Sequence, residues 1–414
     1  RLHPERLDVL HERASTWFEQ HGDVALAIEH AARMNEGTRA AMLLDRHALA
    51  VLARSEMVTL KRWLRLVPEP YRQPWPTLLL SVGWIRALGE RTPELEALFD
   101  AARLAVDAGP PGYDDGRREA TRAEIETLRA YHARFCGRFE EALQTGARLL
   151  QTVPQDATAL RGRVLFNQGR AHMMVGEVAE AAALLQRSID CNLRAGTHYL
   201  VLTGLAQQAA VLLETDGVPR ARHVLEAAVR LAEDQRLTRL PAFSIVLFHL
   251  GHVLVIADEL DDALPLLQSA RALGAAGDMP DGRANAIVAM ARVHAARGEF
   301  DAAEALLLEA ETLARTANLG LLDGDIDVPR RRHALYAADA GLAALPLANR
   351  PGRDDGSGWT LLDEAHDVCD LLEALRRPGD AAREAAAAAI ERIVRECEWR
   401  GRHQAACIAH VAAA

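Results

Sequence analysis

The chain has 414 residues, of which 50% are hydrophobic and 26% charged, so disorder over its whole length is excluded. Aromatic residues supply only 5%, and the Ala- and Leu-rich remainder favours helices over strands. The formal net charge of -10 argues against a nucleic-acid-binding surface, because negative charge repels phosphate backbones.

The N-terminal stretch, residues 1–107, contains weak copies of a helical-hairpin pattern. Gly22 precedes Ala27 by five residues, and Ser55 precedes Leu60 by the same interval. A proline-rich run from 68 to 76 predicts a loop, because proline lacks an amide donor and blocks helix interiors. The chain opens on Arg1 rather than methionine, and we expect it to be part of a longer protein.

Residues 117–345 carry a repeat with a period near 40 residues. Gly or Asp marks a turn at intervals of 39, 40, 42 and 40 residues, at Gly137, Gly176, Asp216, Asp258 and Gly298. Five positions after each turn stands an alanine, at Ala142, Ala181, Ala221, Ala263 and Ala303. Seven positions before each turn stands a small residue, at Ala130, Gly169, Ala209, Gly251 and Ala291. Nine positions after the turn, four repeats carry leucine, at Leu185, Leu225, Leu267 and Leu307, whereas Gly146 departs from the pattern.

This pattern is typical of paired antiparallel helices. A small residue in the first helix and an alanine in the second let the two backbones approach closely, while Gly or Asp permits the tight reversal between them. One hairpin cannot cover its own apolar face, so neighbouring hairpins stack. The template resembles the tetratricopeptide repeat, although the usual period is about 34 residues. We therefore predict an all-α, right-handed superhelical solenoid of tetratricopeptide-like hairpins.

The C-terminal part divides into two segments. Residues 346–358 are poor in apolar residues and are expected to form a flexible linker. Residues 359–414 are expected to form two or three further helices, which end abruptly, as though truncated.

Residues 1–105 resemble the start of the sensor region in MalT-type regulators, the large ATP-dependent LuxR-family activators of bacteria. The matching residues run from Leu10-His11 through Trp17-Phe18, Gly22, Ala27-Ile28 and His30-Ala31 to Leu60, Trp63-Leu64, Pro68 and Pro74-Trp-Pro76. The long-period repeat that follows also fits this family, so the resemblance covers most of residues 3–320.

The resemblance implies a cytoplasmic signal-sensing region that controls transcription activation. Its expected partners are a small-molecule inducer or a regulatory protein, the other domains of the parent regulator, and, through self-association, a second copy of itself. ATP is expected only in a missing upstream domain, since this chain has no GxxxxGK[ST] loop, and a DNA-binding domain is expected elsewhere. We expect this part to bind no cofactor of its own, no nucleic acid and no membrane.

The candidate ligand site lies on the first helices of the hairpins, which line the concave face of such a superhelix. Positions six, three and thirteen residues before the turns point inward, and they hold Tyr131, Arg134, Arg163, Arg170, His252, Asn285 and Arg292. The guanidinium groups of the arginines, together with the tyrosine, histidine and asparagine side chains, suit an anionic or polyhydroxylated ligand. The alternative is an ordinary solvated groove in an Arg-rich protein.

No catalytic or metal site is predicted. His249 and His252 lie three residues apart, but no third and fourth ligand has the spacing of a metal motif. We therefore predict a sensor rather than an enzyme. The alternative function is a free-standing tetratricopeptide-type scaffold whose groove holds a protein segment.

Overall fold

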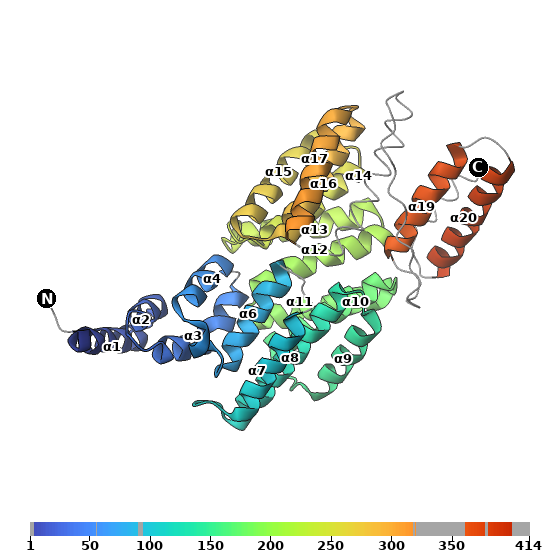
Figure 1. Cartoon of the computed structure of the whole chain (residues 1–414). Helices are drawn as coiled ribbons and strands as arrows, with labels where there is room; N and C mark the ends of the chain where they lie inside the picture. Colours follow the sequence, from blue (N-terminus) through green and yellow to red (C-terminus); the bar gives the residue numbers. More distant parts are fainter. Residues whose placement is uncertain are drawn as a thin grey trace.

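The computed structural model describes residues 4–54, 56–89, 94–317, 319, 361–376 and 380–399. All regular structure in these ranges is helical, and no strand occurs in them. The all-α solenoid of tetratricopeptide-like hairpins predicted from the repeat is confirmed (Figure 1). None of the helices described is both long and apolar enough to span a membrane.

The described residues of the N-terminal part, up to Ala108, form a series of helices. They are α1 (Pro4–Gln20), α2 (Val24–Ala31), α3 (Thr38–Ala53), α4 (Met57–Leu66), α5 (Glu69–Arg72), α6 (Pro76–Gly89) and α7 (Glu94–Ala108). The proline-rich run is not wholly a loop, because it contains the single turn of α5. Proline is tolerated there and at the start of α6, since the first amides of a helix have no partner within it.

The repeat region forms five hairpins, each of which packs its first helix against its second. They are α8 (Asp115–Phe135) with α9 (Phe139–Thr152), α10 (Thr158–Met174) with α11 (Val178–Ala195), α12 (His198–Thr215) with α13 (Val218–Asp234), α14 (Phe243–Ile256) with α15 (Leu260–Ala276), and α16 (Pro280–Ala296) with α17 (Phe300–Thr316). Towards the C-terminus, α19 (Leu361–Arg376) packs against α20 (Asp380–Trp399) around Leu371 and Ile393. The predicted linker 346–358 lies outside the described residues.

The predicted turn residues adopt left-handed backbone geometry in four of the five repeats. Gly137, Gly176 and Gly298 have φ between 76° and 80°, and Asp258 has φ 61°. In the remaining turn the prediction was one residue early, because Asp216 has φ -114° and Gly217 has φ 81°. Glycine takes the left-handed position there because it has no Cβ to clash with the backbone.

The small-residue and leucine columns meet inside each hairpin. All five column alanines are fully buried, and the column leucines are at most 1% exposed. A Cβ placed on Gly169 would lie 2.9 Å from Cγ of Leu185, and one on Gly251 would lie 2.7 Å from Cγ of Leu267. The first helix thus needs a small residue because the leucine of the second helix occupies the space beside it.

The departure at Gly146 has a local compensation. Gln168, on the next first helix, is buried and donates from Nε2 to the carbonyl oxygen of Ala142 at 2.9 Å. Its side chain occupies the space beside Gly146, where a Cβ would lie 2.0 Å from Nε2 of Gln168. A side chain from the next repeat therefore replaces the missing leucine.

A buried carboxylate joins the N-terminal helices to the first hairpin. Asp45 on α3 is 1% exposed, and its Oδ1 accepts from the amides of Thr77 at 2.9 Å and Leu78 at 3.2 Å, at the start of α6. Its Oδ2 accepts from the Tyr113 hydroxyl at 2.9 Å and from Nη2 of Arg117 at 2.6 Å. Burial raises the pKa of Asp45, while the hydrogen bond from Tyr113 and the charge of Arg117 oppose this shift. Three segments distant in sequence are thus held at one carboxylate.

A second long-range contact joins α4 to the turn between α15 and α16. Nζ of Lys61 forms an ion pair with Oδ2 of Asp278, although 217 residues separate them in the chain. Asp278 has a left-handed backbone with φ 53°. Figure 1 shows α4 close to the end of α15, where the turn towards α16 begins. The superhelix thereby brings an early helix against a late repeat.

Candidate functional site

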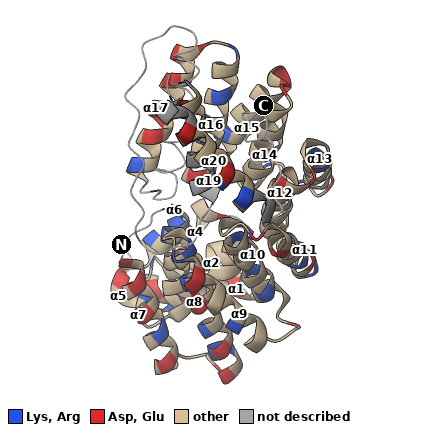
Figure 2. Ribbon diagram, turned by 90° about the vertical axis from the view of Figure 1, so that its right-hand side faces the viewer, with Lys and Arg blue, Asp and Glu red and all other residues tan. Residues whose placement is uncertain are grey.

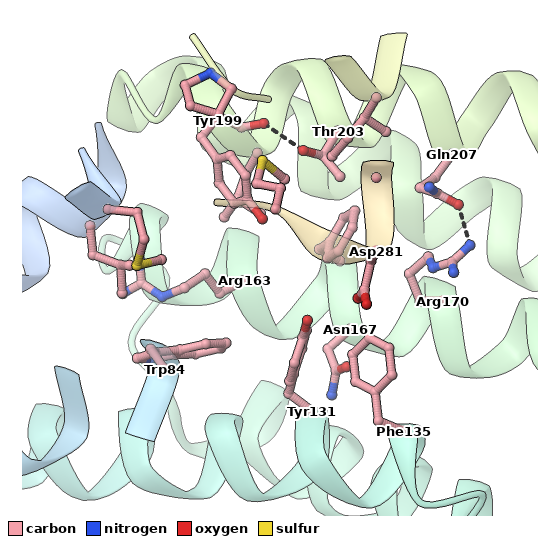
Figure 3. Close-up of a pocket in the computed structure, with 18 of the residues that line it drawn as sticks. Trp84, Tyr131, Phe135, Arg163, Asn167, Arg170, Tyr199, Thr203, Gln207 and Asp281 are labelled. Atoms are coloured by element: carbon pink, nitrogen blue, oxygen red, sulfur yellow. Dashed lines mark hydrogen bonds between the residues drawn. The ribbon is translucent and has the colours of Figure 1, made fainter. Parts of the chain in front are cut away.

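A cavity of about 300 Å³ lies on the inner side of the superhelix (Figure 3). The first helices of all five hairpins contribute to its wall, and α3, the start of α4 and α6 add Leu49, Leu52, Met57 and Trp84. A volume of this size is at the lower end of the range for small-molecule sites. Segments from residue 49 to residue 285 therefore meet around one partly open cavity.

Helical periodicity determines which side chains face the cavity. On α10, Arg163, Asn167 and Arg170 lie four and three residues apart and share one face. On α12, Tyr199, Thr203 and Gln207 recur every four residues. Each first helix thus presents one stripe to the cavity.

Aromatic rings form much of the wall nearest α6 and α8. The ring centroids of Trp84 and Tyr131 are 5.3 Å apart in an edge-to-face arrangement, and those of Tyr131 and Phe135 are 4.6 Å apart. The Arg134 guanidinium lies 4.1 Å from the Phe135 ring centroid, within cation–π range. Phe166 and Phe248 add further apolar surface from α10 and α14.

Arg163 lies at the α10 wall and is paired with a buried acid. Its Nε donates to Oε2 of Glu124 at 3.1 Å, and Glu124 is 5% exposed. Burial lowers the pKa of Arg163 to about 10, so the guanidinium stays protonated at neutral pH. The Arg163–Glu124 pair therefore contributes no net charge.

Several other polar groups of the wall bond to one another. Nε of Arg134 donates to Oδ1 of Asn167 at 3.1 Å, and Nη1 of Arg170 donates to Oε1 of Gln207. Nε2 of Gln207 lies 3.3 Å from Nε2 of His249. Burial, followed by the charge of Arg170, lowers the pKa of His249 to about 3, so this ring is neutral at pH 7 and can accept from the amide.

Asp281 brings an acidic group to the cavity from the first turn of α16. Figure 3 shows it between Tyr131 and Arg170. Tyr199 lies on the α12 side, where burial and then the charge of Asp281 raise its pKa to about 12. Tyr199 therefore stays protonated and neutral at physiological pH.

Five of the seven predicted ligand-binding residues line this cavity. They are Tyr131, Arg134, Arg163, Arg170 and Asn285. His252 and Arg292 do not line it, and Nη1 of Arg292 instead lies 3.1 Å from Nδ1 of His252 on the neighbouring helix. Whether the five bind a ligand stays a prediction.

The cavity runs obliquely across the repeats, which explains this split. On α8 its residues lie two to ten positions before the turn glycine, whereas on α16 they lie thirteen to seventeen positions before it. A column at a fixed distance from the turn therefore enters the cavity in early repeats and leaves it in late ones. The four-residue stripes on α10 and α12 were the signal that would have added Asn167, Tyr199, Thr203 and Gln207.

Residues 123–348 match the family described as the MalT-like TPR region. The chain belongs to this family. Over 352 residues it is 26% identical to the HTH-type transcriptional regulator MalT of Yersinia pestis (strain Pestoides F), and equally identical to that of Serratia proteamaculans (strain 568). The alignments cover 84% of the chain but 38% of each relative, so the chain spans well under half the length of these MalT proteins.

Solved structures share the fold of this MalT-like TPR chain at low sequence identity. A Rap protein complexed with competence and sporulation factor has a TM-score of 0.54 at 11% identity, over 89% of this chain and 95% of that one. A signal transduction ATPase with a tetratricopeptide repeat sensor from Pyrococcus horikoshii has a TM-score of 0.50 at 12% identity, over 81% of this chain and 50% of that one. These likenesses concern the fold alone.

Proposed function

We propose that this chain is the effector-sensing region of a MalT-like transcriptional regulator and that the inner cavity binds its small-molecule effector. In this proposal the region itself is not catalytic and works in the cytoplasm. ATP hydrolysis and DNA binding belong to other parts of the parent protein.

The cavity is the observation that carries the proposal. Its wall combines residues of α3, α4 and α6 with residues of all five hairpins, so an occupant touches both ends of the superhelix. A ligand that binds only the folded, closed arrangement stabilises it and shifts the population towards it. Family membership supports a regulatory role for such a shift.

The test is a thermal-shift screen of metabolites against the wild type and a variant with a blocked cavity. Thr203→Trp places an indole in the cavity from α12, because Thr203 belongs to its wall. Thr152→Trp, at an exposed position on α9, is the matched control. We expect effectors that raise the melting temperature of the wild type and of Thr152→Trp to lose this effect in Thr203→Trp. At 100 times its Kd, a ligand stabilises the fold by about 2.7 kcal/mol.

Two other outcomes would count against a small-molecule sensor. Stabilisation that persists in Thr203→Trp would place the ligand outside the cavity. If the wild-type chain binds peptides from the parent regulator but no metabolite, the scaffold alternative is favoured. If Thr203→Trp fails to fold by circular dichroism, Asn285→Leu removes a polar group from the same wall with less added volume.

A further inference from the structure

The cavity gathers aromatic rings from a chain that has few of them. The whole sequence holds 6 Trp, 5 Tyr and 8 Phe. Six of these rings line the cavity, although its wall takes up only 28 of the 414 residues. They are Trp84, Tyr131, Phe135, Phe166, Tyr199 and Phe248. The composition of the chain alone does not account for this enrichment.

The rings come from different sides of the cavity. Trp84 on α6 and Tyr131 on α8 are in edge-to-face contact, whereas Tyr199 belongs to α12. Figure 3 shows Tyr199 across the cavity from Trp84 and Tyr131. Aromatic rings attract one another when they stack with an offset or meet edge to face. A flat ring system between these walls can therefore make such contacts on more than one side.

Methionines fill the spaces beside the rings. Met57 lies at the start of α4, Met174 at the end of α10, and Met279 directly before α16, and all three line the cavity. An unbranched thioether adapts to the shape of its neighbour and makes favourable contacts with the edges of aromatic rings. These three side chains therefore also suit an apolar aromatic occupant.

Many polar side chains of the wall already use their hydrogen bonds within the protein. Besides the arginine–amide bonds described above, the Thr127 hydroxyl donates to the carbonyl oxygen of Ala123 at 2.7 Å. The Thr203 hydroxyl donates to the carbonyl oxygen of Tyr199 at 2.8 Å. Since a hydroxyl has one proton, these two groups can only accept from a ligand.

Three further polar side chains are available to a ligand. Within the described part of the chain, the side chains of Thr197, Tyr199 and Asn285 make no hydrogen bond. They can match one or two polar groups. A sugar-like molecule carries more hydroxyls than this, and each hydroxyl that is buried without a partner weakens binding. The wall therefore favours a large apolar surface with few polar groups.

We propose that the cavity binds a small aromatic molecule, a flat ring system with one or two hydrogen-bonding groups, in preference to a polyhydroxylated ligand. This proposal rests on the proposed function of the cavity and names its ligand class. The cavity of about 300 Å³ corresponds to the volume of about ten water molecules. A bicyclic ring system with small substituents is of this order.

Three uncharged probes test the ligand class. They are 2-naphthol, decahydro-2-naphthol and methyl glucoside, titrated calorimetrically into the intact chain at pH 7. The first two share a carbon skeleton and a hydroxyl and differ in aromaticity. We expect 2-naphthol to bind at least about threefold more tightly than its saturated counterpart, because aromatic contacts add affinity beyond the buried area. Methyl glucoside should bind most weakly of the three.

Two variants locate the aromatic contact. Phe166→Leu on α10 and Phe248→Leu on α14 each remove a ring and keep an apolar side chain. Each should lower the preference for 2-naphthol over decahydro-2-naphthol by about twofold or more. Phe18→Leu, at a half-buried position on α1 outside the cavity, is the matched control and should leave this preference unchanged. Circular dichroism checks that each variant folds, and the second cavity variant serves if the first does not.

The outcomes separate the ligand class from the proposed function. Undetectable binding of 2-naphthol, equal affinity for 2-naphthol and decahydro-2-naphthol, or tighter binding of methyl glucoside would overturn the aromatic ligand class. So would binding of 2-naphthol that persists in Thr203→Trp, since its site would then lie outside the cavity. If Thr203→Trp abolishes the binding of methyl glucoside or of another non-aromatic metabolite, the ligand class is wrong and the sensor function stands. If no compound responds to Thr203→Trp, both proposals fall.

Discussion

Cys136 is a candidate reactive thiol outside the cavity. Its Sγ lies 3.5 Å from Nε2 of His132, and Nδ1 of the same imidazole lies 3.3 Å from Oε1 of Glu96. The hydrogen bond with His132, and then its charge and that of Arg138, lower the pKa of Cys136. The same hydrogen bond raises the pKa of His132. Both shifts favour the thiolate–imidazolium form of the pair over the neutral form, relative to the isolated groups.

We expect iodoacetamide to alkylate Cys136 faster than an ordinary thiol near pH 7. A lowered pKa means a larger thiolate fraction at any pH below the usual value, so the midpoint of the rate profile should shift to lower pH. Cys191 and Cys369 are buried and should react slowly. Peptide-resolved mass spectrometry against pH measures each rate. His132→Gln should return the midpoint to the ordinary range, and an unchanged midpoint in that variant would remove the assignment.

Asp45 offers a second test at the level of single residues. Asp45→Ala leaves the buried amides of Thr77 and Leu78 without their acceptor, and we expect it to lower the free energy of unfolding by about 3 kcal/mol. Asp107→Ala removes an acid from an exposed pair with Arg122 and should cost less than about 1 kcal/mol. Chemical denaturation measures both values. Similar losses of unfolding free energy in the two variants would show that the buried hydrogen bonds of Asp45 stabilise the fold no more than an exposed ion pair does.

At the scale of helices, the close approach of Gly251 to Leu267 sets the hairpin spacing. Gly251→Ala places a Cβ 2.7 Å from two Leu267 carbons, so we expect a loss of about 1–2 kcal/mol despite the better helix propensity of alanine. Gly116→Ala, whose Cβ would meet only Oδ1 of Asp114 at 3.6 Å, should be neutral or slightly stabilising. Thermal unfolding of both variants measures the difference. An unchanged melting temperature in Gly251→Ala would mean that Leu267 can move aside.

The hairpins were predictable because their contacts are local. The small residue and its leucine stand sixteen positions apart in one repeat, as in Gly251 and Leu267, so a fixed spacing in the sequence reports a fixed contact. A side chain that fills the space of a missing leucine from another repeat has no such fixed spacing in the sequence. Gln168 fills the space beside Gly146 from the next first helix, and no column of the sequence indicates this.

At the scale of the whole molecule, the cavity was predictable only in part. The repeat pattern predicts which face of each first helix points inward, and five of the seven residues predicted in this way line the cavity. The oblique course of the cavity follows from how successive hairpins are displaced, which no single repeat encodes. Leu49, Met57 and Trp84 reach the cavity through long-range packing that the sequence pattern does not report.

Charged residues of both signs are mixed along the helices. Figure 2 shows Lys and Arg interspersed with Asp and Glu in the described helices. This mixture fits a chain whose formal net charge is -10.

Closure of the superhelix at Lys61 and Asp278 is the last feature open to test. Their side chains are 27% and 57% exposed, and an exposed pair contributes at most about 1 kcal/mol. We therefore expect Asp278→Asn to change the melting temperature little but to let α4 separate more often from the α15–α16 turn. The same separation should increase with ionic strength in the wild type, because salt screens the exposed pair.

Lys61 is the single lysine of the chain. Apart from the N-terminal amine, an amine-reactive reagent therefore modifies Lys61 alone. Acetylation of Lys61, followed by mass spectrometry, should be severalfold faster in Asp278→Asn than in the wild type, and an occupant of the cavity should slow it in both. Asp301→Asn, at an exposed position on α17, controls for the lost negative charge. An equal acetylation rate in Asp278→Asn and the control would show that the ion pair does not hold α4 against the late repeats.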